Sequence, residues 1–524
     1  TALEVGEADL VWGFYIPTTD LDRLAADPNL ATWTGITIPA LYFVFVNNNT
    51  PGLDDATIER FAAGHPELVE AIEAAATAYA EVREAHGGLL DLDENEQIQK
   101  VQEGFVNFYP QDGVNPYVAL TARGPWIVTL KGAVLYDTGG YGMLGFGHAP
   151  QAVIDAMAKP QAMANIMTPS LPQMQLDRAL REEIGHTRGG CPFTAFMCLN
   201  SGSESVSLAA RIADTNAKTM TDPGGRHAGR AVKRLVVKGA FHGRTEAPAL
   251  YSDSTRKAYE GALASYRNED SVLVIQPYDL AALKQAFADA DANGWFIEAM
   301  FLEPVMGEGD PGRSVPPEFY AAARELTKAH GSLLLLDSIQ AGLRATGALS
   351  IVDYPGFEDQ EAPDMETYSK ALNAGQYPLS VLALNERAAG IYKRGTYGNT
   401  MTANPRAADV GSAVLGMVTP EVRANIQQRG RQAVEKLEAL KAELGGLITK
   451  VQGTGLLFSC ELSPEFKGYG AGSTEEWLRE NGLGVIHGGE NSLRFTPRFE
   501  MGEDELDLLV DMVRRAVKEG PRKA

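Results

Sequence analysis

The sequence predicts an α/β fold in which helices cover a mostly parallel sheet, with a smaller α+β segment after it. Two observations support this prediction. Short apolar runs alternate with helical patterns between residues 234 and 340, in RLVVKGAFHG, SVLVIQP, WFIEAMFLEPVMGEG, EFYAAARELTKAHG and SLLLLDSIQ. Such alternation is typical of parallel strands joined by crossover helices. After Asn404-Pro405, two helical stretches lead to a segment that ends in LRFTPRFE.

The length of 524 residues exceeds that of one typical domain, so two or three domains are expected. We expect a partly helical N-terminal extension at 1–114, a large domain at 115–405 and a small α+β domain at 406–524. The first part of the large domain is expected to pack with the small domain.

The net charge of −22 repels phosphate backbones and anionic bilayers, so we expect neither nucleic-acid nor membrane partners. The three cysteines cannot form a disulfide framework and no pair has zinc-ligand spacing, so no metal site is expected. The first twenty residues lack a basic segment before an apolar run, and no apolar stretch reaches membrane-spanning length. We therefore expect a soluble, cytoplasmic protein.

The extension carries two local patterns. Residues 54–86 have apolar positions at helical spacing, interrupted by Gly64-His65-Pro66, which predicts two short helices. The stretch DLDENEQIQKVQ, from Asp91, imitates a calcium loop, but its sixth place is Glu96 instead of glycine and its last is Gln102. Helix capping by Asp93 or Asn95 is the better interpretation.

Early in the large domain, GAVLYDTGGYGMLGFGHAPQAVIDAM, residues 132–157, reads as strand, glycine-rich turn and helix. Next, CLNSGSESVSLAARIAD passes from an apolar run through small residues into a helix. The free amides of Gly202 and Ser203, with the Ser203 hydroxyl, would bind a phosphate or a carboxylate. Helix capping alone explains the same residues equally well.

Several chemically capable side chains follow predicted strands. GAFHGRT places Phe241, His242 and Arg244 after one strand, where an aromatic ring can stack on a ligand and an arginine can hold a carboxylate. Individually, such residues are more often structural or surface groups. Glu303 and Glu308 come from EPVMGEGD.

Four leucines run directly into Asp337, and a buried lone carboxylate is costly unless a positive charge or hydrogen bonds compensate it. Parallel sheets collect their ligands at the carboxyl ends of strands, which is where Asp337 is expected. Lys370 lies between a short apolar run and a Gly/Pro turn. A lone lysine is usually a solvated charge, but in a pocket it can act as an amine nucleophile.

Taken together, NSGSES, GAFHGRT, EPVMGEG, LLLLDSIQAGLRATG, SKALNAGQYPLS, GNTMTANP and SLRFTP resemble the class III aminotransferases, pyridoxal 5'-phosphate (PLP) enzymes of fold type I. The resemblance runs from about Asn115 to the C-terminus. It implies a PLP-binding large domain and transfer of an amino group from an ω-amine donor to a 2-oxo acid such as 2-oxoglutarate or pyruvate. The cycle would be ping-pong, through pyridoxamine phosphate.

The resemblance also implies roles for individual residues. Asp337 would pair with the pyridine nitrogen, and Lys370 would form the Schiff base with PLP and move protons. The remaining cofactor contacts would be phosphate binding by Gly202 and Ser203, ring packing by Phe241 and Ile339, a bond from Gln340 to the phenolic oxygen, and His242 beside them. Thr400 matches a residue that reaches the phosphate of the neighbouring subunit, so a homodimer with shared sites is implied.

For the substrate, the resemblance implies that Arg244 holds a carboxylate far from the reacting amine. Glu308 and Arg494 match a switch in which the glutamate neutralises the arginine for an ω-amine donor and releases it for a 2-oxo acid. Two departures from the family pattern stand out: Ser338 replaces an acidic residue beside Asp337, and Thr402-Ala403 replaces two glycines.

Two other functions are compatible with these residues. The same fold and cofactor also serve aminomutases, racemases and decarboxylases, which neither consume a 2-oxo acid nor release an aldehyde by transamination. A non-catalytic protein that binds a partner through the extension is a further alternative, and the intact Asp337, Gln340 and Lys370 argue against it. The extension itself could serve dimer packing or act as a lid.

Overall fold

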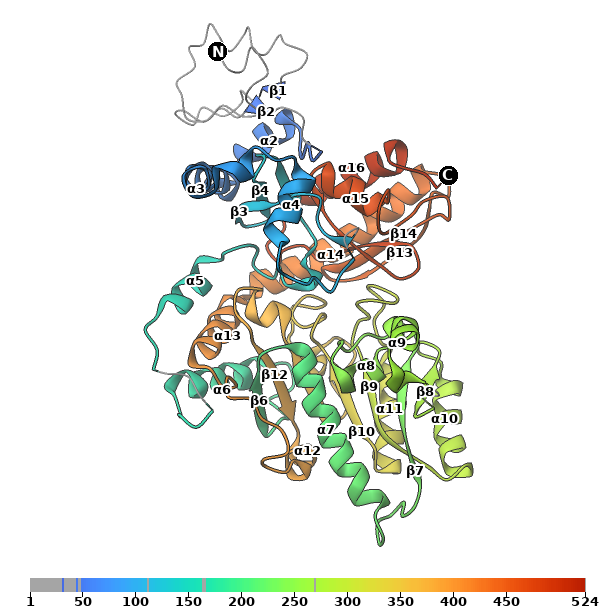
Figure 1. Ribbon diagram of the computed structural model, residues 1–524. Helices are drawn as coiled ribbons and strands as arrows, with labels where there is room; N and C mark the ends of the chain where they lie inside the picture. The colour runs from blue at the N-terminus through green and yellow to red at the C-terminus, as the bar shows by residue number, and fades with distance from the viewer. Residues whose placement is uncertain are drawn as a thin grey trace, which may run out of the picture.

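The computed structural model describes residues 31–32, 44–45, 49–110, 113–162, 166–267 and 270–523. Figure 1 shows two parts. The lower part contains the seven-stranded sheet and its helices, and the upper part contains the smaller sheets and their helices. The first described elements, β1 (Ala31–Thr32) and β2 (Val44–Phe45), form a short antiparallel pair.

The seven-stranded sheet has the order β6-β12-β11-β10-β9-β7-β8. Every pairing between β8, β7, β9, β10 and β11 is parallel, whereas β12 is antiparallel to both of its neighbours. The mostly parallel sheet predicted from the sequence is therefore confirmed. Its strands are β6 (Ala195–Leu199), β7 (Ala231–Val237), β8 (Val272–Ile275), β9 (Trp295–Leu302), β10 (Leu333–Asp337), β11 (Met365–Tyr368) and β12 (Ser380–Leu384).

Helices cover both faces of this sheet, which explains why β10 is a continuous run of leucines. Leu333 and Leu335 pack in one cluster with residues of α7, while Leu334 and Leu336 pack on the other face with residues of α10 and α11. The helices that follow these strands are α7 (Gly202–Thr221), α8 (Glu246–Tyr251), α9 (Arg256–Ala262), α10 (Leu280–Ala292), α11 (Pro317–His330) and α12 (Glu386–Ile391).

Two four-stranded sheets make up the smaller part. One is antiparallel, with the order β13-β14-β17-β16, and the other has the order β15-β5-β4-β3. In the second sheet, β15 from the C-terminal region pairs in parallel with β5, which joins Leu483 to Tyr136. The strands are β3 (Ala119–Arg123), β4 (Trp126–Thr129), β5 (Val134–Asp137), β13 (Ile448–Thr454), β14 (Leu457–Leu462), β15 (Leu483–Gly484), β16 (Ile486–Gly488) and β17 (Ser492–Phe495).

The helices outside the large sheet complete the fold. The two stretches predicted after Asn404-Pro405 are confirmed as α13 (Pro405–Met417) and α14 (Pro420–Glu443). Helix α13 packs against α5 and α6, and α14 packs against α16. The division into domains at 114/115 and 405/406 stays a proposal. The remaining elements are α5 (Gln151–Ala158), α6 (Leu171–Glu183), α15 (Thr474–Glu480), α16 (Glu503–Glu519), η4 (Asp253–Thr255), η5 (Ala264–Tyr266) and η6 (Ile351–Asp353).

The N-terminal helices confirm a break at Gly64-His65-Pro66, because α2 (Asp55–Ala62) ends before it and α3 (Pro66–Leu90) begins at its proline. The second helix extends to Leu90, with a kink at His86, where the backbone is not helical. Helix α4 (Glu94–Gln102) begins at the segment that imitates a calcium loop.

Asp93 is the cap of α4, as predicted. Its carboxylate accepts from the Glu96 amide at 2.8 Å, and the Glu96 carboxylate accepts from the Asp93 amide at 3.2 Å. Two acidic groups of the apparent calcium loop are therefore engaged in capping.

The extension packs onto the small sheet of its own chain. Leu68 and Ile72 of α3 are buried, and α3 contacts β3 and β4. The ring of Phe61 lies 5.2 Å from that of Trp126, centroid to centroid. The extension thus shares a hydrophobic core with β3 and β4, which Figure 1 shows beside α2 and α3.

Among the described helices, none combines the length and the apolar composition needed to cross a bilayer.

Candidate active site

Residues that follow β6, β7, β9, β10 and β11 meet at one edge of the large sheet. These strands run in the same direction, so their carboxyl ends lie together, as the sequence predicted for the ligand site. They surround a cavity of about 170 Å³ lined by Ser201, Gly202, Ser203, Phe241, His242, Gly243, Glu303, Asp337, Ile339, Gln340, Ser369 and Lys370. The cavity therefore brings together eight of the predicted site residues from four separate segments, and Glu303 adds a fifth segment.

Asp337 ends β10 and is only 5% exposed. Its Oδ2 atom lies 2.8 Å from Nδ1 of His242, and its Oδ1 atom accepts from the amide of Ile339 at 3.1 Å. These bonds hold the carboxylate in one orientation and offset part of its desolvation.

The loop after β7 holds Phe241 and His242 through its backbone. The Phe241 amide donates to the Glu303 carboxylate at 3.2 Å, and the His242 amide donates to the Ser252 hydroxyl at 2.8 Å. Gly243 has a φ of 111°, and a Cβ there would lie 2.3 Å from the Ser203 hydroxyl. Only glycine therefore allows this loop to approach the start of α7 so closely.

The start of α7 lines the same cavity. The Ser201 side chain caps the helix by accepting from the Glu204 amide at 3.2 Å. Gly202 and Ser203 begin the helix, and a Cβ on Gly202 would lie 2.6 Å from the Cδ1 atom of Ile339. The helix start and Ile339 are thus in close contact, with free first-turn amides and the positive end of the helix dipole at the cavity.

Lys370 directly follows Ser369 at the end of β11 and begins η7 (Lys370–Asn373). Its φ of 39° is in the left-handed region, which is uncommon for a residue with a side chain. Ser369 and Asn373 both donate to the carbonyl of Leu379 at 2.8 Å, and these two bonds hold the turn. Burial, and secondly the charge of Arg494, lowers the pKa of Lys370 to about 8.

Glu308 and Arg494 are paired beside this cavity. Nη1 of Arg494 lies 3.1 Å from the Glu308 carboxylate and 3.3 Å from Oε1 of Gln340, and it also donates to the carbonyl of Gly307. Arg494 is fully buried, yet its Nε and Nη2 atoms have no hydrogen-bond partner among the described residues. Two donors of the guanidinium therefore remain available to a ligand.

Arg244 is exposed and is not among the residues that line the cavity. Its guanidinium carbon is 5.4 Å from the ring centroid of Phe241, 5.7 Å from that of Phe108 and 5.9 Å from that of Tyr109. Aromatic faces hold the cation without neutralising it, so the charge stays available to a carboxylate.

Thr400 is not brought into the cavity. It is exposed, and its neighbour Asn399 donates to Glu204 in the first turn of α7 at 3.1 Å. The departure residues Thr402 and Ala403 line a separate groove with Cys198 and Tyr397.

Ser338, the other departure, donates to the buried carboxylate of Glu366 at 2.5 Å. Glu366 lies on the neighbouring strand β11, and its carboxylate also accepts from Ser350 and from the Ile351 amide. Burial raises the pKa of Glu366 to about 7. A buried acid therefore contacts position 338 after all, but it comes from the neighbouring strand β11.

Two residues of the site were missed as site residues by sequence reasoning. Glu303 was noticed but given no role; it lines the cavity, and burial raises its pKa to about 7. Tyr141 lies in η3 (Gly140–Gly142), its carbonyl accepts from Gln340 at 3.4 Å, and its ring centroid is 5.3 Å from the Arg494 guanidinium carbon. The glycines around Tyr141 were the available signal, because they indicate a tight turn.

The cavity has the groups that PLP requires. An oriented carboxylate at Asp337 suits a protonated ring nitrogen, and the start of α7 suits a phosphate. Lys370 supplies an amine for the aldehyde, and Phe241 and Ile339 supply apolar surfaces for the ring. The residues present therefore fit the cofactor that the resemblance implies.

Comparisons with known proteins agree with this geometry. Residues 108–517 match the family model described as aminotransferase class-III. An acetylornithine aminotransferase of Xanthomonas axonopodis pv. citri (strain 306) is 32% identical over 316 residues, which cover 59% of this chain and 71% of that protein. A succinylornithine transaminase of Citrobacter koseri is 29% identical, covering 75% and 90%. An ornithine aminotransferase from Toxoplasma gondii, solved with PLP at partial occupancy in its active site, has a TM-score of 0.67 at 23% identity and covers 83% and 97%.

Proposed function

Because this chain belongs to the class III aminotransferases and is a PLP-dependent transaminase of fold type I, we propose that it moves an amino group from an ω-amine of the ornithine type to a 2-oxo acid. The observation that carries the proposal is the contact between Glu308 and Arg494 beside the Lys370 cavity. This pair gives one site two charge states: it is neutral while Glu308 contacts Arg494, and cationic when the two side chains separate. The alternative aminomutase, racemase and decarboxylase functions gain no support from the comparisons.

The chain's own residues divide the work around the cofactor. Bound PLP accepts the electron pair released when a C–H bond next to the substrate nitrogen breaks. Asp337 would hold the ring nitrogen, and His242 and the Ile339 amide keep its carboxylate oriented. Gly202 and Ser203 would bind the phosphate at the start of α7.

Lys370 would hold and move the proton in both halves of the cycle. Its pKa of about 8 makes its Nζ atom able to give and take a proton near neutral pH. The turn after β11 fixes the backbone position from which the Lys370 side chain extends.

Substrate recognition is proposed to use two arginines. Arg244 would bind the carboxylate remote from the reacting amine, since the aromatic rings around it leave its charge uncompensated. Arg494 would grip the α-carboxylate of the 2-oxo acid with its free Nε and Nη2 donors once Glu308 turns away. With the amine donor bound, Glu308 would stay in contact with Arg494 and cancel its charge.

A homodimer with shared sites is part of the proposal. Thr400 is exposed and separate from the cavity of its own chain, as a residue that serves a neighbouring subunit would be. Exposed apolar side chains support this, because Met143, Met174 of α6 and Met401 are 41%, 64% and 49% exposed.

The test separates the two half-reactions. Holoenzyme is mixed with ornithine, N-acetylornithine, lysine, γ-aminobutyrate or β-alanine without an acceptor, and its visible absorbance is followed; 2-oxoglutarate is then added. We expect a terminal-amine donor to remove the PLP absorbance and 2-oxoglutarate to restore it, with one glutamate formed per donor consumed. Donor consumption without glutamate formation would instead indicate a mutase, racemase or decarboxylase.

A further inference from the structure

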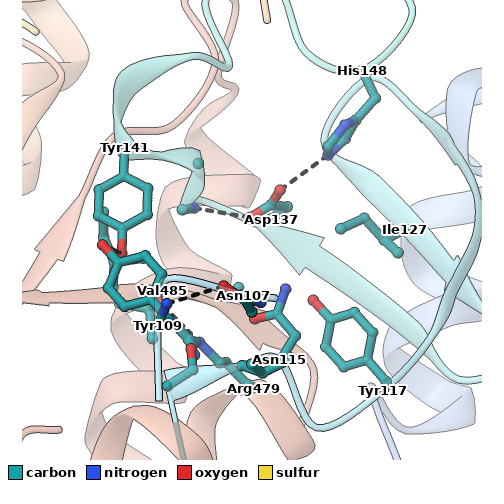
Figure 2. Close-up of a pocket in the computed structure, with 16 residues that line it drawn as sticks. Asn107, Tyr109, Asn115, Tyr117, Ile127, Asp137, Tyr141, His148, Arg479 and Val485 are labelled. Carbon is teal, nitrogen blue, oxygen red and sulfur yellow. Dashed lines mark hydrogen bonds and ion pairs between the residues drawn. The ribbon is translucent and has the colours of Figure 1, made fainter. Parts of the chain in front are cut away.

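A second cavity, of about 400 Å³, lies next to the active site and shares no lining residue with the Lys370 cavity. Its walls come from the 107–117 region, β5, the glycine-rich turn and β15–β16, and include Tyr109, Tyr117, Asp137, Tyr141, His148 and Ile486. Figure 2 shows Asp137 between His148 on one side and the rings of Tyr109 and Tyr141 on the other. Tyr141 connects the two sites, because its ring also faces the Arg494 guanidinium at 5.3 Å.

The charge of this cavity is negative when His148 is neutral. Asp137 Oδ2 lies 3.0 Å from Nε2 of His148, and Oδ1 accepts from the Gly139 amide at 2.9 Å. Among the described residues of the wall, the other charged side chain is Arg479, which is already paired with the buried carboxylate of Glu475. The Asp137 charge is therefore the one that the cavity offers to a ligand.

Aromatic surfaces surround this carboxylate. The rings of Tyr109 and Tyr141 are stacked, with centroids 6.2 Å apart and planes 12° apart, and their hydroxyls are bonded at 2.6 Å. Tyr117 is buried on another wall, and Ile486 adds apolar surface. Aromatic faces combined with a carboxylate recognise organic ammonium ions, because both attract a cation and the rings also contact its alkyl groups.

We propose that this second cavity binds an organic ammonium ion at Asp137, independently of the Lys370 cavity. The ion has two possible sources, a second molecule of the amine donor or a separate amine that is no substrate. In either case the bound ion contacts the ring of Tyr141, and the same ring contacts the Arg494 guanidinium.

Binding is measured by calorimetry on the PLP-loaded enzyme with butyltrimethylammonium as the probe, at pH 8, where an imidazole is ordinarily neutral. This probe has no N–H group and cannot react with PLP. We expect one site per chain and at least tenfold weaker binding in Asp137→Asn, which keeps the shape of the side chain. Asn115→Trp, at an exposed position of the cavity wall, should block binding without touching Asp137.

Glu308→Gln is the matched control, because it removes the carboxylate of the catalytic side and should leave probe binding unchanged. Retained PLP absorbance and melting temperature show that each variant is folded. The proposal is overturned if wild type does not bind the probe, or if Glu308→Gln weakens binding while Asp137→Asn and Asn115→Trp do not. Because no turnover is required, this result is independent of the proposed substrates.

Steady-state kinetics identify which amine occupies the second cavity. If the donor is the occupant, excess donor should change the rate in wild type and this effect should vanish in Asn115→Trp. If wild type binds the probe but both proteins respond alike to excess donor, the site serves a separate amine. Both results support the ammonium site and assign its ligand.

Discussion

His242 and Asp337 form a buried pair, with Nδ1 and Oδ2 only 2.8 Å apart. The two residues follow different strands, β7 and β10, so the contact depends on the whole sheet edge being formed. It leaves the Asp337 carboxylate with a fixed direction before any cofactor binds.

Asp337→Asn should lower kcat about a thousandfold while PLP still binds. A charge pair at about 4 Å and an effective dielectric of about 20 is worth about 4 kcal/mol, and each ~1.4 kcal/mol is about a tenfold change in rate. Steady-state kinetics check this, with PLP absorbance as the control. His242→Phe removes one hydrogen bond and should cost only about tenfold. A loss below tenfold in Asp337→Asn would contradict the role of its charge.

The rate of PLP capture by the apo-protein should rise with pH through about 8 and level off above it. The lowered pKa of Lys370 means that its neutral amine, the nucleophilic form, is populated above that pH and lost below it. Stopped-flow absorbance after mixing apo-protein with PLP measures this rate. Lys370→Ala should bind PLP without the covalent absorbance band and lose turnover. A midpoint near the ordinary lysine value of 10.5 would show that burial does not act on this amine.

Arg494→Lys and Glu308→Gln should damage opposite half-reactions. Lysine keeps the charge but loses the forked donors, so kcat/KM for the 2-oxo acid should fall at least about tenfold, with little change for the amine donor. Glu308→Gln leaves Arg494 uncompensated and should harm the donor half more. Single-turnover kinetics of each half measure both effects. Equal damage to both halves by either variant would refute the switch.

Phe61→Ala should lower the free energy of unfolding by about 3–5 kcal/mol, because this buried ring packs on Trp126. Phe105→Ala, in the same extension but 83% exposed, should change it by less than about 0.5 kcal/mol. Urea unfolding followed by tryptophan fluorescence compares the two. Similar small effects would mean that the extension is not part of the core.

Glu366→Gln should flatten the dependence of stability on pH. The pKa of Glu366 is raised from 4.5 to about 7, so the folded state favours its protonated form. The contribution of Glu366 to the free energy of unfolding is therefore fully present below a pH of about 4.5 and is lost as the pH rises through about 7. Between pH 5.5 and 8, wild type should lose about 2 kcal/mol more than the variant. Ser338→Ala should destabilise the protein by about 1–3 kcal/mol by removing a donor from a buried carboxylate. Parallel pH profiles of wild type and Glu366→Gln would contradict this account.

The sequence was informative where local pattern determines structure. The run of leucines before Asp337 indicated a strand of the parallel sheet, and the order of strand ends placed Lys370 and Phe241 at one edge. Their roles toward PLP came from the family resemblance and stay predictions.

The missed features depend on contacts between distant segments. β15 has only two residues, and its pairing with β5 connects positions more than 300 residues apart, which no periodicity reveals. Tyr141 was overlooked because its ring contacts Arg494, which β17 brings to it from a distant part of the chain. Likewise, Glu366 brings an acid to position 338 from a neighbouring strand, although the serine there suggested its loss.

The pairing of β15 with β5 also has a consequence for synthesis on the ribosome. All strands of the large sheet lie between residues 195 and 384, so that sheet can assemble as soon as this stretch has emerged. The sheet of β3, β4 and β5 lacks its last strand until residues 483–484 appear, about a hundred residues later. We therefore expect nascent chains to fold from the middle outward, with the N-terminal helices among the last elements to be protected from protease.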